Sequence, residues 1–360
     1  MADATVHFLV PDGIEDDARV SGGNVYDLRL AEALRARGRD VRIVPVATDG
    51  LTDAAGALST LPDDAVVLVD GLIAVAASEV LDAHSTRLRI VVLAHMVASA
   101  LPGVHDQARA AEREREALNA ARRVIATSDW IRSELAARDL AAPDRIAVAR
   151  PGTDAAAVAS GSQSAGHLLC IGAVAPHKGQ DLLVEALAGM TDLPEWTCSI
   201  VGSLDADRDF ADRTAAAIQS AGLTHRVALT GVLTGRRLGD AYGTADLVVA
   251  PSRAEGYGMV VAEALARGIP VVATRVGGLP EAIAGSAAGI LVPPNDPGAL
   301  RAVLRRWRED PRWRAALKAE ALRSRAASRA WDEPAGIAAA VLDEVRSAID
   351  VVGRDQRGAR

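Results

Sequence analysis

Residues 247–265 read LVVAPSRAEGYGMVVAEAL and contain an apolar run, a glycine-rich turn and a helical segment in that order. The apolar run 247–250 predicts a strand covered on both faces, as in a parallel sheet. Glu255 precedes the turn, and Glu263 lies one turn inside the helix. Because a helix N-terminus has unpaired N–H groups and partial positive charge, this crossover favours a phosphate flanked by carboxylates that accept from sugar hydroxyls.

Short β-branched runs alternate with Ala- and Leu-rich segments on both sides of this crossover. The predicted strands are 6–10, 41–46, 66–69, 90–93, 124–127, 146–149, 168–171, 197–201, 227–229, 247–250, 271–273 and 289–292. The predicted helices are 25–37, 106–121, 131–138, 181–188, 209–221, 238–242, 259–266, 279–284 and 297–309. Such alternation with short links predicts an α/β chain with doubly wound parallel sheets.

The chain length predicts two domains, because 360 residues exceed what one hydrophobic core holds. Residues 155–166 (AAAVASGSQSAG) are small and lack periodicity, as a linker would. We therefore expect Rossmann-like domains at 1–160 and 161–328, with a ligand cleft between them, and a helical tail at 329–360. The tail pattern begins at residue 311 and is interrupted at 331–334.

Composition excludes several classes of protein. The net charge is −7, and the first 160 residues account for it with 17 cations and 24 acids, so a nucleic-acid partner is not expected. The only two cysteines, Cys170 and Cys198, lie in strand-like runs, which fits a reducing, cytoplasmic location. We expect no signal peptide, because no basic stretch precedes an apolar run near residue 1, and no integral membrane segment, because no apolar run reaches about 18 residues.

The crossover resembles the signature of retaining glycosyltransferases of the GT4 type, which have the GT-B fold. The resemblance begins with residues 251–281, PSRAEGYGMVVAEALARGIPVVATRVGGLPE. Further segments agree in the family's order: Ser21-Gly22-Gly23, Ser128, 151–154 (PGTD), 177–181 (HKGQD), 227–231 (VALTG) and 245–249 (ADLVV). It spans residues 5 to 345 and implies that the C-terminal helices return to the first domain.

On the donor side, the resemblance implies that Lys178 contacts the donor diphosphate, Glu255 binds hydroxyls of the transferred hexose and Glu263 binds the nucleotide ribose. Backbone N–H groups for sugar and phosphate would come from Gly258, Met259 and Val260. The competing interpretations are a solvated loop lysine, a helix-capping Glu255 and a solvated Glu263. Lys178 is one of only two lysines, the other being Lys318.

In the first domain, the resemblance implies that Gly22 and Gly23 let the backbone approach the donor phosphate. His95 follows an apolar strand and would lie near the reacting centre. A histidine at a strand end is also a common structural residue, so both interpretations of His95 stay open.

One position departs from the family pattern, and one motif resembles a metal site but has a simpler interpretation. The usual Arg after the strand is Ala173 here, so one diphosphate cation is missing, and His177, Arg253 or Arg275 would have to compensate. The D-x-D of Asp205 and Asp207 precedes a helix and is interpreted as an N-terminal cap. The resemblance implies no essential metal, because cationic groups and the helix end stabilise the leaving diphosphate.

The predicted function is that of a retaining hexosyltransferase, which moves a hexose from a UDP- or GDP-sugar to an acceptor hydroxyl without metal or cofactor. The acceptor would be a small molecule or glycoside bound by the first domain. The mixed-charge segment 108–123 and the acidic first half disfavour, without excluding, peripheral contact with a membrane.

Other functions stay open or are disfavoured. A catalytically weak or inactive nucleotide-sugar-binding protein and a sugar-nucleotide epimerase would share the fold. A phosphorylase needs a pyridoxal-phosphate lysine, which neither Lys178 nor Lys318 convincingly offers. A dinucleotide oxidoreductase is disfavoured because no strand is followed by G-x-G-x-x-G.

Overall fold

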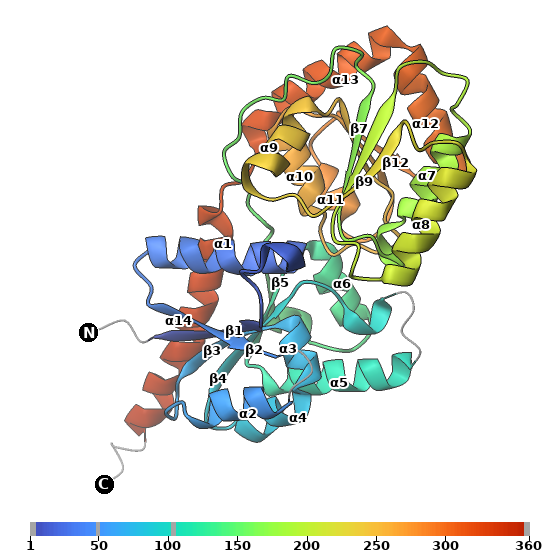
Figure 1. Ribbon diagram of the computed structural model, residues 1–360. Coiled ribbons are helices and arrows are strands. Elements are labelled where there is room, and N and C mark those ends of the chain that lie inside the picture. The colour runs from blue at the N-terminus through green and yellow to red at the C-terminus, as the bar shows by residue number, and fades with distance from the viewer. Residues whose placement is uncertain (1–4, 48–50, 102–105, 356–360) are drawn as a thin grey trace. The chain divides into compact units, whose positions relative to one another are not determined.

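The chain forms two compact α/β units (Figure 1). The computed structural model describes residues 5–47, 51–101 and 106–355. Unit 1 comprises residues 1–15, 22–152 and 330–360, and unit 2 comprises residues 16–21 and 153–329. Each unit contains one six-stranded, all-parallel sheet with helices on both faces.

The sheet of unit 1 has the strand order β2-β1-β3-β4-β5-β6. Its strands are β1 (Val6–Pro11), β2 (Val41–Val46), β3 (Val66–Asp70), β4 (Arg89–Ala94), β5 (Arg123–Ala126) and β6 (Ile146–Val148). Its helices are α1 (Gly22–Ala36), α2 (Leu51–Ser59), α3 (Gly71–Ala76), α4 (Ser78–His84), α5 (Gln107–Ala120), α6 (Asp129–Ala137) and α14 (Asp332–Asp355). Short 3-10 helices lie at Asp17–Arg19 in unit 2 and at Ala98–Ala100 and Pro143–Arg145 in unit 1.

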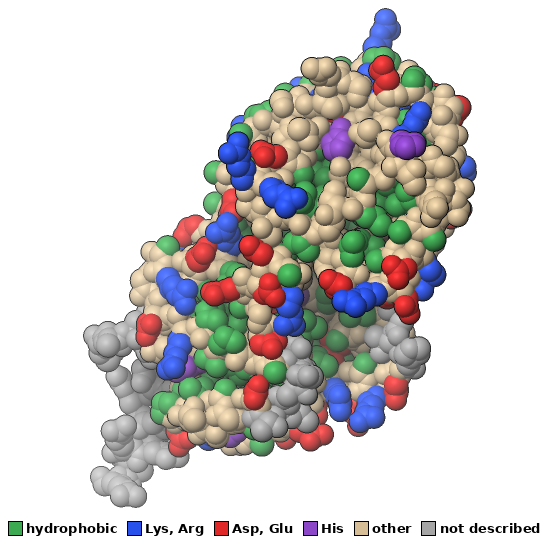
Figure 2. Space-filling model, in the orientation of Figure 1, with side chains coloured by type: hydrophobic (Ala, Val, Ile, Leu, Met, Phe, Trp, Pro, Cys, Tyr) green, Lys and Arg blue, Asp and Glu red, His purple; other side chains and the backbone are tan. Residues whose placement is uncertain are grey.

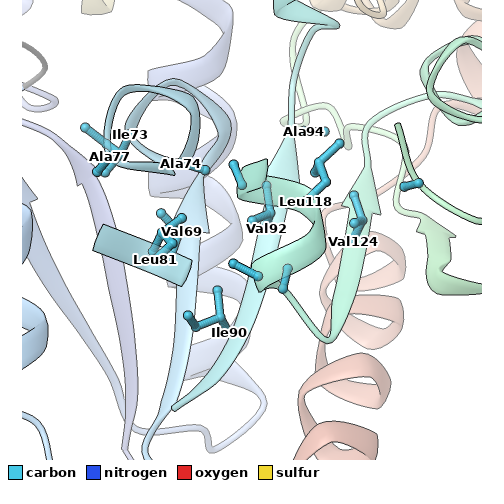
Figure 3. Packing of buried hydrophobic residues seen from close by; sticks show 14 of the residues in the cluster. Val69, Ile73, Ala74, Ala77, Leu81, Ile90, Val92, Ala94, Leu118 and Val124 are labelled. Atoms are coloured by element: carbon cyan, nitrogen blue, oxygen red, sulfur yellow. The ribbon is translucent and has the colours of Figure 1, made fainter. Parts of the chain in front are cut away.

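Aliphatic side chains build the core of unit 1, as the 3% aromatic content requires. Figure 3 shows Val69, Ile90, Val92 and Val124 from the strands meeting side chains of α3, α4 and α5. On the other face, α1 and α14 pack against each other and against the strands (Figure 1). The C-terminal helix α14 is thus part of unit 1, although it follows unit 2 in sequence.

The sheet of unit 2 has the strand order β12-β11-β10-β7-β8-β9. Its strands are β7 (His167–Ile171), β8 (Thr197–Val201), β9 (Val227–Gly231), β10 (Leu247–Ala250), β11 (Val271–Thr274) and β12 (Gly289–Val292). Its helices are α7 (Gln180–Ala188), α8 (Arg208–Ser220), α9 (Gly235–Thr244), α10 (Met259–Ala266), α11 (Leu279–Ile283), α12 (Pro297–Glu309) and α13 (Pro311–Ser324). Short 3-10 helices lie at Pro176–Lys178 (η4) and Arg325–Ala327.

Two apolar clusters stabilise unit 2, one on each face of its sheet. Helices α7, α8 and α12 cover one face of the sheet, and α9, α10 and α11 cover the other (Figure 1). Helix α13 contributes to both clusters, with Leu317 in the first and Ala321 in the second. None of the helices in the described part of the chain has the length and hydropathy of a membrane-spanning segment. On the face that Figure 2 shows, basic and acidic side chains are interspersed and do not gather into one basic patch.

The fold differs from the sequence-based expectation in two places. Helices α2, α3 and α4 were absent from the prediction. For α3 and α4, the nearly continuous apolar run 65–81 conceals the change from strand to helix. Asp70 makes that change: it ends β3, and its carboxylate caps α3 by accepting from the N–H of Leu72 at 2.8 Å.

The segment 155–166 is not a free linker. It packs on unit 2, where Ala159 N donates to Arg267 O at 2.9 Å and Gly161 N donates to Gly243 O at 3.0 Å. The contact-based division therefore falls between residues 152 and 153 and not at the expected residue 160. Its small residues reflect close packing: a Cβ on Gly161 would lie 2.5 Å from an oxygen of Asp246.

Candidate functional site

The strand order of unit 2 creates a topological switch point between β7 and β10. Successive strands run in opposite directions across the sheet from these two neighbours. In open parallel sheets, ligands bind beyond the carboxyl ends of the strands at such a point. Lys178 follows β7 and Glu255 follows β10, so the topology brings two of the predicted site residues to this place.

Lys178 and Glu255 form an ion pair at the switch point. Lys178 Nζ donates to Glu255 Oε2 at 2.7 Å, and the two side chains are 24% and 18% exposed. Ser252 Oγ donates to the same carboxylate oxygen at 3.3 Å. The methylene stem of Lys178 lies over Gly172, where an added Cβ would be 3.5 Å from Cδ. Both charges are therefore held together while they remain accessible from solvent.

Arg253 connects the two loops that carry this pair. His177 O accepts from Arg253 N at 2.7 Å and from Ala254 N at 3.2 Å. The Arg253 guanidinium donates to both carboxylate oxygens of Asp181, at 2.8 and 2.7 Å. This guanidinium thus acts as a clamp that joins the loop after β10 to the start of α7. The expectation that it could replace the missing cation at Ala173 is not supported.

Glycines hold the backbone of the signature turn in place. A Cβ on Gly277, which has φ of +54°, would lie 1.8 Å from Glu255 O. Gly278 N donates to that oxygen at 3.0 Å. The turn after β11 therefore needs glycine to pack against the backbone of Glu255.

Helix α10 begins at Met259, so Gly258, Met259 and Val260 lie at the helix end where the phosphate site is predicted. Gly258 is the N-cap residue with φ of +101°. The N–H groups at this end have no acceptor within the helix, so they provide donors for an anion. One turn further on, Glu263 Oε2 accepts from the Tyr242 hydroxyl at 2.6 Å. Burial raises the pKa of Tyr242, so its phenol remains a donor.

Unit 1 holds His95 in a buried triad with two carboxylates. His95 follows β4, Asp70 ends β3, and Asp27 lies in α1. His95 Nε2 is 2.7 Å from Asp27 Oδ1 and 3.4 Å from Asp70 Oδ2. The imidazole is 16% exposed, whereas the Asp27 and Asp70 side chains are 0% and 3% exposed. His95 was predicted from the sequence, whereas Asp27 and Asp70 were not.

The triad has the geometry of hydrogen-bonded groups. Its three polar atoms lie within 4.8 Å of one another. Two ligand atoms that each lie about 2.1 Å from the same metal ion are about 3 Å from each other. His95 Nε2 and Asp27 Oδ1 are closer than that, at 2.7 Å. A proton fits this separation. Opposing effects act on His95: burial lowers its pKa, the charges of Asp27 and Asp70 raise it, and the carboxylates prevail.

Asp27 could have been found from the helical period. Residues 26, 30, 31 and 34 of α1 are apolar and buried, and position 27 lies on the same stripe. A carboxylate on a buried stripe requires a partner, which is a signal of a polar site. Gly22 and Gly23 begin the same helix.

Three other motifs have structural roles. Lys318 Nζ donates to the buried carboxylate of Asp246 at 2.8 Å. Asp207 caps α8 by accepting from Phe210 N at 2.8 Å, which confirms the capping interpretation of the D-x-D motif. In α5, most charged side chains of the mixed-charge segment are exposed, whereas Glu114 is buried and accepts from Ala98 N and Ser99 N.

Comparisons with known proteins connect this geometry to a family. The family described as "Glycosyl transferases group 1" matches residues 162–324. The chain is 34% identical to D-inositol 3-phosphate glycosyltransferase 1 of Catenulispora acidiphila, over 69% of this chain and 63% of that protein. It is 32% identical to the D-inositol 3-phosphate glycosyltransferase of Kineococcus radiotolerans, over 66% and 59%. The aligned part thus spans about three fifths of these relatives.

Solved structures share the fold across both units. Sucrose-phosphate synthase from Thermosynechococcus elongatus superposes with a TM-score of 0.76 at 21% identity, covering 99% of this chain and 100% of that chain. The Anabaena protein HepE, in complex with UDP and glucose, superposes with a TM-score of 0.74 at 18% identity, covering 95% and 100%. Residues 162–324 place the chain in the group 1 glycosyltransferase family, of the GT4 type, and its two parallel sheets give it the GT-B fold.

Proposed function

We propose that the chain is a retaining hexosyltransferase that uses a UDP- or GDP-sugar and needs no metal. The observation that carries the proposal is the Lys178–Glu255 pair at the switch point of unit 2, beside the start of α10. A cation, a carboxylate and a helix N-terminus are the groups that a sugar joined to a diphosphate requires. The relatives named as glycosyltransferases and the HepE complex with UDP and glucose support this substrate class.

In this proposal, donor binding redistributes contacts that exist in the free protein. Lys178 would exchange its 2.7 Å bond to Glu255 for a phosphate oxygen. Glu255 would then accept from hexose hydroxyls, while Ser252 still donates to it. Glu263, held by the Tyr242 hydroxyl, would accept from the ribose. The N–H groups at the start of α10 would bind the diphosphate and stabilise the charge that develops on it.

The proposed reaction exchanges one bond at the anomeric carbon of the hexose. The bond from this carbon to the diphosphate oxygen breaks, and the acceptor oxygen forms a bond on the same face. The acceptor proton passes to the departing phosphate, so no base from the protein is required. We assign the acceptor, a small molecule or glycoside, to unit 1, and we place the reaction in the cytoplasm.

The test is a thermal-shift panel of nucleotide sugars on the wild type, Lys178→Met and Glu255→Gln. A donor at 100 times its Kd should stabilise the wild type by about 2.7 kcal/mol and should have little effect on either variant. NMR of the anomeric proton in the product then reports whether configuration is retained. If both variants turn over at the wild-type rate, the site assignment is wrong.

A second candidate function is nucleotide-sugar binding without efficient transfer. Ala173 stands where the family has an arginine, and Arg253 is occupied by Asp181. Lys178 would then be the principal side-chain cation for the diphosphate. Tight binding of a nucleotide sugar with no release of free nucleotide, across a panel of acceptors, would favour this alternative.

A further inference from the structure

Two buried carboxylates from different elements converge on one nitrogen of His95. Asp27 comes from α1 and Asp70 from the end of β3, and both face His95 Nε2. An ionised carboxylate only accepts hydrogen bonds, so Nε2 must carry a proton. Nδ1 lies on the other side of the ring, and the imidazole keeps 16% of its surface exposed.

We propose that Asp27 and Asp70 are positioning residues that hold His95 as an imidazolium, so that Nδ1–H is a fixed hydrogen-bond donor to an oxygen atom of a bound substrate. The substrate in this inference rests on the proposed function. The assignment of the charge state of His95 does not, because it is argued from Asp27, Asp70 and His95, which all belong to unit 1.

The buried charges of the triad support this assignment. An imidazolium with two carboxylates would leave one net negative charge in a site where both acids are at most 3% exposed. One further proton between the carboxyl groups would make the triad neutral. Burial, with a smaller contribution from the nearby Asp70, raises the pKa of Asp27 to about 7 against the opposing effect of His95, so Asp27 holds this proton below about pH 7 and is ionised above it.

A further neighbour of His95, Tyr26, adds no charge. Tyr26 lies edge-on to the imidazole with ring centroids 5.1 Å apart, and its hydroxyl donates to Ala149 O at 2.8 Å. Burial raises the pKa of the Tyr26 phenol, so this group stays neutral. Among the residues that the structure describes, the charges that act on the pKa of His95 are the carboxylates of α1 and β3, and both favour the cation.

This charge state determines which chemistry His95 can supply. An imidazolium cannot remove a proton from an acceptor hydroxyl, because its own proton must leave first. It can donate a charge-assisted hydrogen bond to a hydroxyl or phosphoryl oxygen. His95 would thus act as an electrostatic donor, which agrees with a transfer reaction that needs no protein base.

The first test is an NMR titration of the full chain without substrate. The sequence has seven histidines, and the His95 signal is identified by its loss in His95→Asn. We expect His95 to titrate above its ordinary pKa of 6.5 and Asp27→Asn to lower that midpoint by about one to three pH units. Titration at or below 6.5, or no change in Asp27→Asn, would overturn the inference. Suppression of the titration by equimolar zinc chloride would also overturn it, because an ion would then occupy the place of the proton.

The second test is the pH profile of kcat/KM for transfer. The rate should fall at alkaline pH as His95 loses its proton, and Asp27→Asn should move this fall to lower pH. His95→Asn, which keeps an N–H donor, should retain more activity than His95→Phe. Glu114→Gln removes another buried carboxylate of unit 1 that does not contact His95, and should leave the alkaline limb in place. If Glu114→Gln moves the limb as Asp27→Asn does, the effect is structural and the inference fails. If transfer is absent in the wild type, the proposed function fails and the NMR titration still decides the charge state.

Discussion

The two lysines of the chain allow one substitution to be compared in two environments. Lys178 and Lys318 each form one ion pair with a carboxylate, at 2.7 and 2.8 Å. The Lys178 pair is partly accessible on both sides, whereas the Asp246 side chain that Lys318 contacts is 0% exposed. We predict that Lys178→Met removes donor binding with little loss of stability, and that Lys318→Met does the reverse.

The magnitudes follow from the burial of each carboxylate. In Lys178→Met, Glu255 stays 18% exposed, and an accessible pair contributes about 0–1 kcal/mol to the free energy of unfolding. In Lys318→Met, Asp246 becomes a buried charge without a cation, which costs about 3–5 kcal/mol when nothing else compensates. Asp246 keeps donors from Ser162 and from His167 N, so we expect a smaller loss of about 1–3 kcal/mol.

For UDP binding we expect the larger effect from Lys178→Met and the smaller from Lys318→Met. A hydrogen bond from an ammonium to a phosphate is worth about 1.5–3 kcal/mol, so Lys178→Met should weaken UDP binding by about 10- to 150-fold. Lys318→Met should bind UDP within about twofold of the wild type, provided that it is folded at the assay temperature. Urea unfolding measures the first quantity and isothermal titration calorimetry the second. The reasoning is refuted if the two variants lose UDP affinity equally, or if Lys178→Met is the less stable protein.

Three further predictions use other contacts. Gly277→Ala should destabilise the protein by about 1–3 kcal/mol more than Gly285→Ala, and only Gly277→Ala should weaken UDP binding. Both positions have positive φ, but only a Cβ at position 277 would meet a backbone oxygen, at 1.8 Å. Equal effects of the two substitutions in urea unfolding and calorimetry would contradict this. Tyr242→Phe removes the 2.6 Å hydrogen bond to Glu263 and should lower the free energy of unfolding by about 1–2 kcal/mol. It should also raise the Kd for UDP more than the Kd for inorganic diphosphate. A uniform change in both Kd values would argue against a ribose contact. The pKa of Asp27 is raised from 3.8 to about 7, so the folded state holds a proton that the unfolded chain has released, and stability should fall as pH rises through this window. Asp27→Asn should flatten that slope in melting temperatures measured from pH 5 to pH 8, and parallel curves would show that Asp27 does not titrate in this way.

Much of the fold was predictable from local pattern. The strands β2, β8, β10 and β12 were predicted with their exact bounds, because short runs rich in apolar and β-branched residues between turn-forming or polar residues are typical of strands. The signature around Glu255 was also readable, since a strand, a glycine turn and a helix follow one another within about twenty residues. One error came where a single residue serves two elements, as Asp70 does between β3 and α3.

The sequence by itself determined the kind of chain this is: two parallel α/β sheets, an acidic first half and the glutamate signature of a glycosyltransferase family. Only the tertiary structure decided which charges meet. The ion pair joins residues 178 and 255, the triad joins 27, 70 and 95, and the clamp of Arg253 on Asp181 removes a cation that the sequence left available. The physical reason is that sequence periodicity reports burial along one element, whereas electrostatics depends on distances between elements that only the strand order brings together.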